Sequence, residues 1–518
     1  MLEVRNLSVS TLSGRKILEN VNFIANDGDK IAIIGEEGNG KTTLLKAIVN
    51  KNALTKSFIV SGTIKTDSDN IGYLEQILDP AWNNLTALDY ILQQSPDSEP
   101  DYEIYNEFGT ISQLASQFGL KEDFFDGVQK IGTLSGGEKV KLQLVKLMYK
   151  KPTLILMDEP TNDLDISTLE FLEDFINKKK CPIIYVSHDE TLLEHTANHI
   201  LHLEQIKRKT QPRVTFAPVG YTEYVKTRIA AFEKQDQIAT QEQAERKEQL
   251  RITNEIKGRI QQANPGRTNS MRAVLAREAR WERTKVTEHT ESEDSIKVQF
   301  LNDETIPNQK VVLDLSMPKL SIGGHVLAKD IELNIVGPKK VVIVGNNGCG
   351  KSTLLKHIVN FYNTHDVSGI RFSYMPQNYD DFLDPNETPL DFLCEEAGKE
   401  EKEMIRQTLG RLKFTSDEMT TEIGRLSGGQ RAKIYLTKLM LSDSNVLILD
   451  EPTRNLSPLS NPVVRSLFKS YGGAIISVSH DRKFISEVFD KAYELSDDGL
   501  KDADYLLDKN KSSGYEKE

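Results

Sequence analysis

Cysteine is scarce in this sequence, and long apolar runs are missing from it. The 518 residues include three cysteines, at the widely separated positions Cys181, Cys349 and Cys394. They offer neither a disulfide framework nor the paired spacing of a zinc site, so we expect three reduced thiols. No uninterrupted apolar run approaches the roughly 20 residues of a membrane helix, and the first residues lack the basic-then-apolar pattern of a secretory signal. We therefore expect a soluble, cytoplasmic protein that does not enter a membrane.

The overall charge is acidic. The chain carries 65 Lys and Arg residues against 77 Asp and Glu residues, a formal net charge of −12. This balance argues against a protein that coats nucleic acid with its whole surface, although it is compatible with a local basic segment. A length of 518 residues exceeds one ordinary hydrophobic core, so we expect two or three domains.

Four motifs occur twice in the chain, in the same order. They are GEEGNGKT (Gly35–Thr42) and GNNGCGKS (Gly345–Ser352), LSGGE and LSGGQ from Leu134 and Leu426, LILMDEPT and LILDEPT ending at Thr161 and Thr453, and YVSHD and SVSHD ending at Asp189 and Asp481. The spacing repeats as well, because 24 positions separate Ser135 from Glu159 and also Ser427 from Glu451. The chain is therefore a tandem repeat of one unit.

The first motif follows an apolar run in each copy, IAIIG or VVIVG, and precedes a helix-forming run. We interpret the apolar runs as buried parallel strands. The backbone N–H groups of a glycine-rich loop at a helix N-terminus can wrap phosphate oxygens. Lys41 and Lys351 are expected to contact the β- and γ-phosphates, and Thr42 and Ser352 to place a hydroxyl on Mg²⁺. The alternative, a glycine-rich turn without chemistry, is disfavoured by the full match to the phosphate-loop pattern.

The third motif ends in two adjacent acids in each copy. Asp158 and Asp450 suit the Mg²⁺ shell, which prefers hard oxygen ligands. Glu159 and Glu451 follow directly, where a carboxylate can activate a water for attack on the γ-phosphate.

A histidine follows the second apolar strand of each repeat. His188 and His480 both lie 29 positions after the glutamate of their own repeat. Each is expected to hydrogen-bond the γ-phosphate and to hold the attacking water. A lone histidine would more often be structural, and the repetition at one offset favours the catalytic interpretation.

The LSGGE and LSGGQ motifs place a serine and glycines at the start of a helix, so each could simply be a helix cap. Together, however, the four motifs resemble those of ATP-binding-cassette (ABC) proteins, in which the signature of one cassette covers the ATP bound by the other. The resemblance implies an Mg²⁺-dependent ATPase of the α/β class that binds two ATP per chain. Its fold would be two ABC nucleotide-binding domains joined by a long α-helical hairpin linker.

The resemblance also implies the residues of two composite sites. Gln76 and Gln377 match the glutamine that senses Mg²⁺ and water, and are counted as metal residues with Thr42, Ser352, Asp158 and Asp450. The nucleotide-binding residues would be Gly35, Glu36, Glu37, Gly38, Asn39, Gly40, Lys41, Thr42, Thr43, Gln76, Ser135, Gly136, Gly137, Glu138, Gly345, Asn346, Asn347, Gly348, Cys349, Gly350, Lys351, Ser352, Thr353, Gln377, Ser427, Gly428, Gly429 and Gln430.

Two departures from the family pattern bear on these sites. The runs TLSGRK and KLSIGGH hold no aromatic residue at the place where the family often stacks one on adenine, so base recognition is expected to be loose. Ser457 stands where the first repeat has Asp165, and Gln430 stands where it has Glu138. We therefore expect two inequivalent sites.

The segment between the repeats is rich in helix formers. It predicts a helix to about Gln262, a break at Asn264–Gly266 and a second helix to about Thr287. We place the first cassette at residues 1–215, the hairpin at 216–292 with a tip near 263–268, the second cassette at 293–503 and a polar tail at 504–518.

The hairpin is a basic island in an acidic chain. From Arg251 to Lys285 there are nine Lys and Arg residues and three Glu, a net of +6. Such an arm suits phosphate contacts to structured RNA, although a solvated charged hairpin is the alternative. The candidate RNA-binding residues are Arg259, Asn264, Pro265, Gly266, Arg267, Arg272 and Arg277.

Two cassettes in one chain, joined by a helical hairpin, resemble the ABC-F group. The resemblance implies a partner, the bacterial ribosome. An ABC-F protein enters the tRNA exit site, contacts large-subunit rRNA and peptidyl-site tRNA without a dedicated protein subunit, and leaves after hydrolysis. The run EPTRNLSPLSNP from Glu451 resembles the members that protect the peptidyl-transferase centre from pleuromutilins, lincosamides and streptogramin A by displacing that tRNA. A housekeeping translation factor of the same group is the alternative. The ATPase subunit of a transporter, or a DNA-repair or chromosome-organising cassette protein, fits the hairpin less well.

Overall fold

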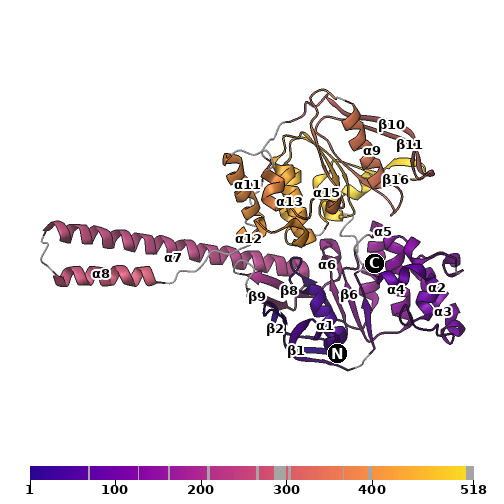
Figure 1. Cartoon of the computed structure of the whole chain (residues 1–518), viewed down its shortest axis with the longest axis horizontal. Helices are drawn as coiled ribbons and strands as arrows, with labels where there is room; N and C mark the ends of the chain where they lie inside the picture. Colours follow the sequence, from indigo (N-terminus) through magenta and orange to yellow (C-terminus); the bar gives the residue numbers. More distant parts are fainter. Residues whose placement is uncertain are drawn as a thin grey trace. The chain divides into compact units, whose positions relative to one another are not determined.

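The computed structural model describes residues 1–67, 70–76, 78–126, 128–161, 164–206, 211–263, 268–284, 299–300, 305–365, 367–394, 399–454 and 456–508. By their contacts the residues of the chain divide into two compact units. One unit comprises Met1–Tyr221 and Ile296–Glu518, which hold both repeats, and the other comprises Thr222–Ser295. Figure 1 shows the chain, coloured along the sequence.

The strands alternate with helices in both repeats. The strands are β1 (Leu2–Thr11), β2 (Lys16–Ala25), β3 (Lys30–Ile34), β4 (Phe58–Thr66), β5 (Ile71–Leu74), β6 (Leu154–Asp158), β7 (Ile183–Val186), β8 (His199–Ile206), β9 (Gln211–Ala217), β10 (Val311–Ile322), β11 (His325–Val336), β12 (Lys340–Val344), β13 (Phe372–Met375), β14 (Val446–Asp450), β15 (Ala474–Val478), β16 (Lys491–Ser496) and β17 (Gly499–Asp502).

The α-helices of both units are α1 (Lys41–Leu54), α2 (Ala87–Leu92), α3 (Phe108–Gln117), α4 (Gly136–Tyr149), α5 (Ile166–Lys178), α6 (Glu190–Thr196), α7 (Tyr221–Ala263), α8 (Thr268–Arg283), α9 (Lys351–Thr364), α10 (Pro389–Cys394), α11 (Lys399–Arg411), α12 (Ser416–Met419), α13 (Gly428–Leu441), α14 (Asn461–Ser470) and α15 (Arg482–Val488). Among the described residues, no helix combines the length and the apolarity needed to cross a membrane.

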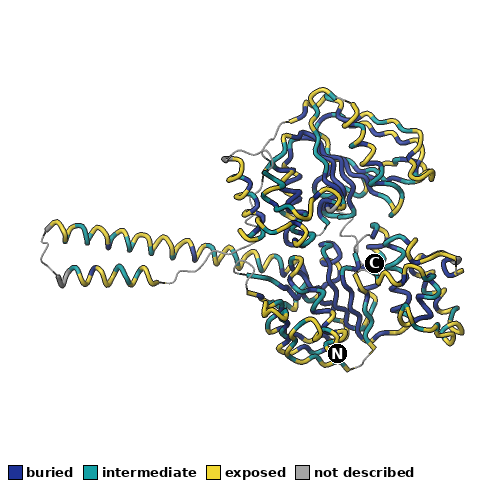
Figure 2. Tube along the Cα trace, in the orientation of Figure 1, coloured by how far each residue is buried: buried dark blue, intermediate teal, exposed yellow. Residues whose placement is uncertain are grey.

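Each repeat is built on a six-stranded sheet. The strand orders are β5-β6-β7-β3-β8-β9 and β13-β14-β15-β12-β16-β17. Both sheets are parallel except for their last strands, because β9 and β17 run antiparallel to their neighbours. The apolar runs IAII and VVIV lie in the central strands β3 and β12 and are almost fully buried, as parallel strands require. Figure 2 shows these strands as the dark core of each repeat. The α/β fold predicted from the sequence is therefore correct.

This strand order positions the motifs. In the first repeat β7 lies between β6 and β3, and all three are parallel. The phosphate loop follows β3, the paired acids end β6, and His188 follows β7 by two residues. Because the carboxyl ends of parallel strands meet at one edge of the sheet, the motifs lie together there. The second repeat uses β12, β14 and β15 in the same way.

The second unit is a hairpin of α7 and the shorter α8, which lie side by side (Figure 1). Lys257 on α7 pairs with Glu278 on α8 at 2.7 Å, and Arg277 donates to Oε1 of Gln249 at 2.8 Å. Thr253 is fully buried in this unit. With 43 residues, α7 extends about 64 Å at 1.5 Å per residue.

The predicted limits of these helices can be compared with the structure in part. α7 ends at Ala263, one residue beyond the predicted end, whereas α8 ends at Arg283, before the predicted end near Thr287. The predicted tip residues Asn264, Pro265, Gly266 and Arg267 lie outside the described residues.

The expectation of a separate polar tail from residue 504 is wrong for its first residues. Asp504–Leu507 form a 3-10 helix, η8, and Leu506 and Leu507 pack against the core of the second repeat. Asp504 also pairs with Lys491 at 2.7 Å and accepts from the backbone N–H of Ala492. The prediction failed because Leu506 and Leu507 are only two apolar residues within a polar stretch, which is too short a run to indicate burial. Residues 509–518 lie outside the described part of the chain.

Candidate functional site

The phosphate loops adopt the same conformation in both repeats. Gly35 and Gly345 have φ angles of 145° and 147°. A Cβ at Gly35 would lie 2.2 Å from the carbonyl oxygen of Leu203, so no other residue fits this close approach. The lysine of each loop bends back toward it. Lys41 Nζ donates to the carbonyl oxygens of Gly35 at 2.9 Å and Glu36 at 3.2 Å, and Lys351 repeats both contacts.

The predicted Mg²⁺ residues lie beside the phosphate loops. In the first repeat, the Thr42 hydroxyl bonds to the Asp158 carboxyl, and in the second Ser352 Oγ donates to Asp450 Oδ1 at 3.3 Å. Burial raises the pKa of both aspartates above its usual range, because it disfavours their charge. Within the described part of the chain, the buried Oδ1 of Asp158 has no hydrogen-bond partner. A buried carboxylate oxygen without a donor, next to a hydroxyl, fits a hard divalent cation.

Two side chains contact the carboxyl group of Glu159. Gln76 Nε2 donates to its Oε2 at 2.8 Å, and His188 Nε2 lies 3.2 Å from its Oε1. The other ring nitrogen, Nδ1, lies 2.7 Å from the carbonyl oxygen of Leu456 in the second repeat. A carbonyl only accepts, so Nδ1 carries a hydrogen. The imidazole of His188 and the carboxyl group of Glu159 thus lie together where a water could be activated.

Glu451 has a different environment. It accepts from the backbone N–H of His480 at 3.3 Å, and its Oε1 lies 3.7 Å from His480 Nε2. Burial and the neighbouring Asp450 raise the pKa of Glu451 to about 8. Burial and the positive charge of Lys351 lower the pKa of His480 to about 3. Both groups therefore favour their neutral forms at pH 7. Gln377 lines a cavity together with Glu451 and His480.

Both glutamates also hold an unusual backbone conformation. Glu159 has a φ of 49° and Glu451 a φ of 53°, in the left-handed region that residues with a Cβ rarely adopt. Such strain tends to occur at functional sites, where the surrounding structure imposes it. Its recurrence at equivalent positions is independent support for the importance of both residues.

The signature motifs do form helix caps, as the alternative interpretation proposed. Ser135 accepts from the backbone N–H of Glu138, whose carboxylate accepts from the backbone N–H of Ser135, at the start of α4. Ser427 and Gln430 make the same reciprocal pair at the start of α13. A capping box of this kind contributes about 0.5–2 kcal/mol to stability.

The second signature also contacts the first phosphate loop. The backbone N–H of Gly429 donates to Glu37 Oε2 at 2.5 Å, and Lys433 Nζ pairs with Glu36 Oε1 at 3.0 Å. The N-terminal N–H groups of α13 thus already hold a carboxylate oxygen, and phosphate oxygens are the same kind of acceptor. We name the site with Lys41 "site one" and the site with Lys351 "site two".

Two cavities border these groups. A cavity of about 270 Å³ at site one is lined by Arg15, Ile17, Gly38, Ser427 and Gln430, among others. A cavity of about 420 Å³ at site two is lined by Ile322, Leu327, Lys351, Asp450, Glu451, His480 and Thr353, and also by His188 from the first repeat. Ile17, Ile322 and Leu327 flank the turns where the sequence offered no aromatic residue, so a base would contact aliphatic side chains.

The first signature, Ser135–Glu138, was predicted to cover site two, but it contacts that site less closely than the second signature contacts site one. A Cβ on Gly137 would lie 3.9 Å from Asn347 Nδ2 in the phosphate loop. Ser135, Gly136 and Glu138 all belong to the described ranges and do not line the site-two cavity. The two halves of the predicted composite arrangement are therefore unequal in this structure.

The ABC transporter family model matches residues 18–162 and 328–454, which together are more than half of the chain. The chain belongs to this family. It is therefore an ATPase with two cassettes, which use ATP and Mg²⁺, as the sequence motifs predicted.

Curated relatives match nearly the whole chain and support the assignment to the ABC-F group. ABC transporter F family member 5 of Arabidopsis thaliana is 26% identical, covering 96% of this chain and 76% of the relative. ATP-binding protein Uup of Escherichia coli is 28% identical over 92% of this chain and 77% of its own. Among solved structures, archaeal ribosome recycling factor aABCE1 matches 99% of this chain and 92% of its own, with a TM-score of 0.59 and 16% identity. This last likeness confirms the tandem-cassette fold.

Sequence reasoning missed two groups of site one. One is Lys433, which contacts Glu36, and the other is the carbonyl of Leu456, which accepts from His188. Lys433 lies three residues after the signature, so a search of the helix following that motif would have found it. The Leu456 carbonyl has no side-chain signal, because the contact is made by the backbone.

Proposed function

We propose that this chain is a ribosome-binding ABC-F ATPase that protects the peptidyl-transferase centre from antibiotics. It would enter the tRNA exit site and displace peptidyl-site tRNA through its hairpin, and ATP hydrolysis would release it. The observation that carries the proposal is a basic two-helix arm inserted between two nucleotide-binding cassettes.

The surface of the arm supports RNA as its target. Arg259 on α7 and Arg272 on α8 are both exposed, whereas Arg251 is engaged by Glu248 and Glu255 along α7. Arg277 is exposed too, but it bonds to Gln249 and so helps to join the helices. Exposed arginines on a rigid arm suit the phosphates of folded RNA. The solved relative aABCE1 is described as a ribosome recycling factor, which supports a ribosomal target for this chain.

Within this proposal the residues of each site have separate roles. Lys41 and Lys351 neutralise the phosphates, and Asp158 and Asp450 hold Mg²⁺ with the neighbouring hydroxyls. The metal would stabilise the charge that develops on the transferred phosphoryl group. Glu159, positioned by Gln76 and His188, would take the proton of the attacking water at site one.

The roles at site two follow the same scheme. Glu451 would activate the water in its ionised form, which the charge of Mg²⁺ held by Asp450 would favour. His480 would contact the γ-phosphate, and Gln377 would orient both groups. The signature at Ser135–Glu138 would cover this site, as Ser427–Gln430 covers site one. These roles at site two are assigned by analogy with the contacts observed at site one.

Translation in a reconstituted bacterial system, with tiamulin or lincomycin, tests the proposal. We expect wild-type protein to restore synthesis in the presence of either drug, because displacement of the tRNA favours ribosome states that bind the drug less well. The matched control is a drug that binds the small subunit, against which no rescue is expected.

A second measurement separates protection from ribosome binding. Ribosome pelleting with and without ATP should show nucleotide-dependent association. If the protein pellets with ribosomes but never restores synthesis, the antibiotic proposal is wrong and a housekeeping translation factor is the better function. If it does not pellet under any condition, the ribosomal target itself is wrong.

A further inference from the structure

Two largely buried ion pairs join the cassettes, with Arg482 the most exposed of the four side chains at 14%. Arg465 on α14 of the second cassette contacts Glu190 on α6 of the first with both terminal nitrogens, at 2.5 and 3.2 Å. Arg482 on α15 pairs with Glu173 on α5. The residues Arg465, Glu190 and Glu173 are each less than a tenth exposed. The acidic partner comes from the first cassette in both pairs, and the basic partner from the second.

The four residues occupy equivalent positions in the repeat. Glu451 follows Glu159 by 292 positions, and His480 follows His188 by the same interval. Glu173 and Arg465 are also 292 positions apart, as are Glu190 and Arg482. Each ion pair therefore joins one position of the repeat to the other, and the two pairs are related by the internal symmetry. Only the charge is reversed, from glutamate at both positions of one cassette to arginine at both positions of the other.

Neighbouring residues match the charge at each position. His195 Nδ1 lies 2.8 Å from Glu173, and Glu487 accepts from Arg465 Nε at 2.9 Å. His195 and Glu487 are again 292 positions apart. The neighbouring residue therefore differs between the cassettes in the same way as the charge: His195 contacts Glu173, and the acidic Glu487 contacts Arg465.

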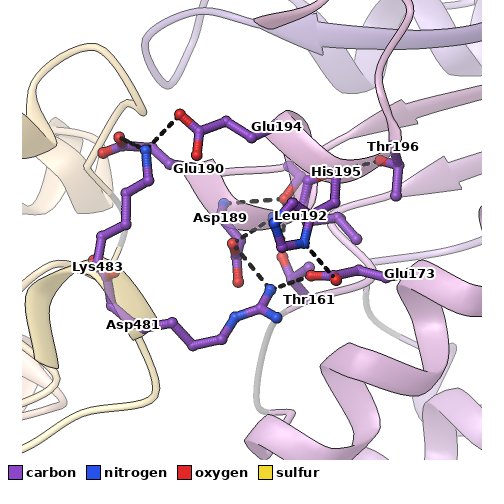
Figure 3. Close-up of polar contacts among 12 residues, drawn as sticks. Thr161, Glu173, Asp189, Glu190, Leu192, Glu194, His195, Thr196, Asp481 and Lys483 are labelled. Carbon is purple, nitrogen blue, oxygen red and sulfur yellow. Dashed lines mark hydrogen bonds and ion pairs between the residues drawn. The ribbon is translucent and has the colours of Figure 1, made fainter. Parts of the chain in front are cut away.

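A third basic residue extends the contact. Lys483 Nζ lies 2.6 Å from Glu194 and 3.3 Å from Glu190, as Figure 3 shows together with the contact of His195 and Glu173. The position equivalent to Lys483 in the first cassette is Thr191, so this contact cannot be made in reverse.

We propose that these reversed charges form a pairing code, which makes each first cassette accept a second cassette and reject another copy of itself. Pairing two first cassettes would place Glu173 against Glu190, and pairing two second cassettes would place Arg465 against Arg482. Like charges buried against each other repel strongly because little water screens them. The lysines of the phosphate loops and the serine and glycines of the signatures recur in both cassettes and do not distinguish them, whereas the charges at α5, α6, α14 and α15 do.

The test uses charge reversals in the full chain. The acidic variant carries Arg465→Glu and Arg482→Glu, the basic variant carries Glu173→Arg and Glu190→Arg, and the swapped variant carries all four changes. We expect ATP turnover to fall about 10²-fold or more in the acidic and basic variants, because breaking a buried pair is strongly unfavourable. The swapped variant should regain a large part of the lost turnover, because both pairs are restored with opposite polarity, but it should stay below wild type because Glu487 and Lys483 then face like charges.

Mixing provides a readout that a purely structural role would not change. The acidic and basic variants, monomeric when alone, should form a one-to-one complex when mixed and recover turnover, as measured by light scattering after size exclusion. The inference is overturned if either reversal leaves turnover unchanged, or if mixing gives neither complex nor activity. It is also overturned if the swapped variant, with a native circular-dichroism spectrum, is no more active than the acidic and basic variants.

Discussion

At the scale of single residues, Glu159 and Glu451, which follow the buried Asp158 and Asp450, differ in how they are held. Glu159 is fixed by Gln76 and by His188, whose ring also reaches the second cassette through the Leu456 carbonyl. Glu451 has nearly the same side-chain exposure, 13% against 12% for Glu159, and accepts from the backbone N–H of His480. Glu159 is thus positioned through contacts from both cassettes, and Glu451 through the backbone of its own cassette.

The difference predicts unequal effects of single substitutions. Glu159→Gln and Glu451→Gln should each preserve ATP binding, and the double variant should lose most turnover, by about 10²–10⁴-fold, because the general base is removed. The single variants should differ in turnover, measured as phosphate release over a range of ATP concentrations. Superimposable kinetics for the two single variants would contradict the inequivalence, and normal phosphate release by the double variant would contradict the assignment of the base.

A second difference lies in the phosphate loops. Glu37 occupies the position of Asn347 in the other loop, and its carboxylate accepts from the backbone N–H of Gly429. The carboxylate competes with phosphate oxygens for this donor and repels their charge. We expect Glu37→Asn to tighten ATP binding at site one by about two- to tenfold, the equivalent of one hydrogen bond.

The measurement for Glu37→Asn is calorimetric titration in a Lys351→Ala background, which leaves site one alone to bind. The control is Asn347→Asp in a Lys41→Ala background, which should weaken binding at site two. Weaker binding by the Glu37→Asn chain would show that the carboxylate assists the nucleotide instead of competing with it.

At the scale of elements, the hairpin combines residues that hold it together with residues that remain exposed. The pair between Lys257 and Glu278 joins α7 to α8, whereas Arg259 and Arg272 point their charges to solvent. Charge-neutralising substitutions can therefore be chosen that leave the helix packing intact.

The double change Arg259→Ala and Arg272→Ala should weaken ribosome binding and flatten its salt dependence. Each lost phosphate contact lowers the slope of log affinity against log salt by about 1. Binding is measured by pelleting at several salt concentrations, for the double variant and for each single change. Arg251→Ala is the control of equal charge change for each single variant, since Arg251 is engaged within α7. An equal loss in the control would mean that overall charge, and not these positions, governs binding.

At the scale of the whole molecule, the duplicated cassettes predict two nucleotides per chain. Titration of wild-type protein with ATP and Mg²⁺ should give a stoichiometry of two, and Lys351→Ala should reduce it to one because the lysine lies in the phosphate loop of site two. Chelation of Mg²⁺ should abolish turnover, because the charge on the phosphates is then uncompensated. A stoichiometry of one for the wild type would contradict two working sites.

Much of this architecture could be predicted from the sequence, because repeated motifs fix both the strands and the loops between them. The IAIIG and VVIVG runs become β3 and β12, and the paired acids end β6 and β14. Contacts between cassettes were harder to predict. The bond from His188 to the Leu456 carbonyl carries no side-chain signal, and the contact of Lys433 with Glu36 joins residues almost 400 positions apart. Such contacts depend on how two folded cassettes meet, which local pattern does not encode.

The charged residues that pair across the cassettes can be seen in the sequence, but their pairing could not be predicted from it. Glu173 and Arg465 stand at one repeat position, yet a single charge difference on a helix is usually a solvated surface feature. Only their burial and their pairing with Arg482 and Glu190 distinguish them. The glycine-rich loops, by contrast, can be recognised in the sequence, because the backbone needs glycine where it approaches another chain segment closely.

The packing of η8 against the second cassette has a practical consequence for handling this protein. Ala503 is fully buried, and Leu506 and Leu507 cover part of the hydrophobic core, so the chain as far as Leu507 contributes to folding. An affinity tag or fluorescent reporter should be attached after Asp508, with a spacer. Shortening the chain to residue 502 would uncover apolar side chains, and aggregation during purification would then be mistaken for loss of function.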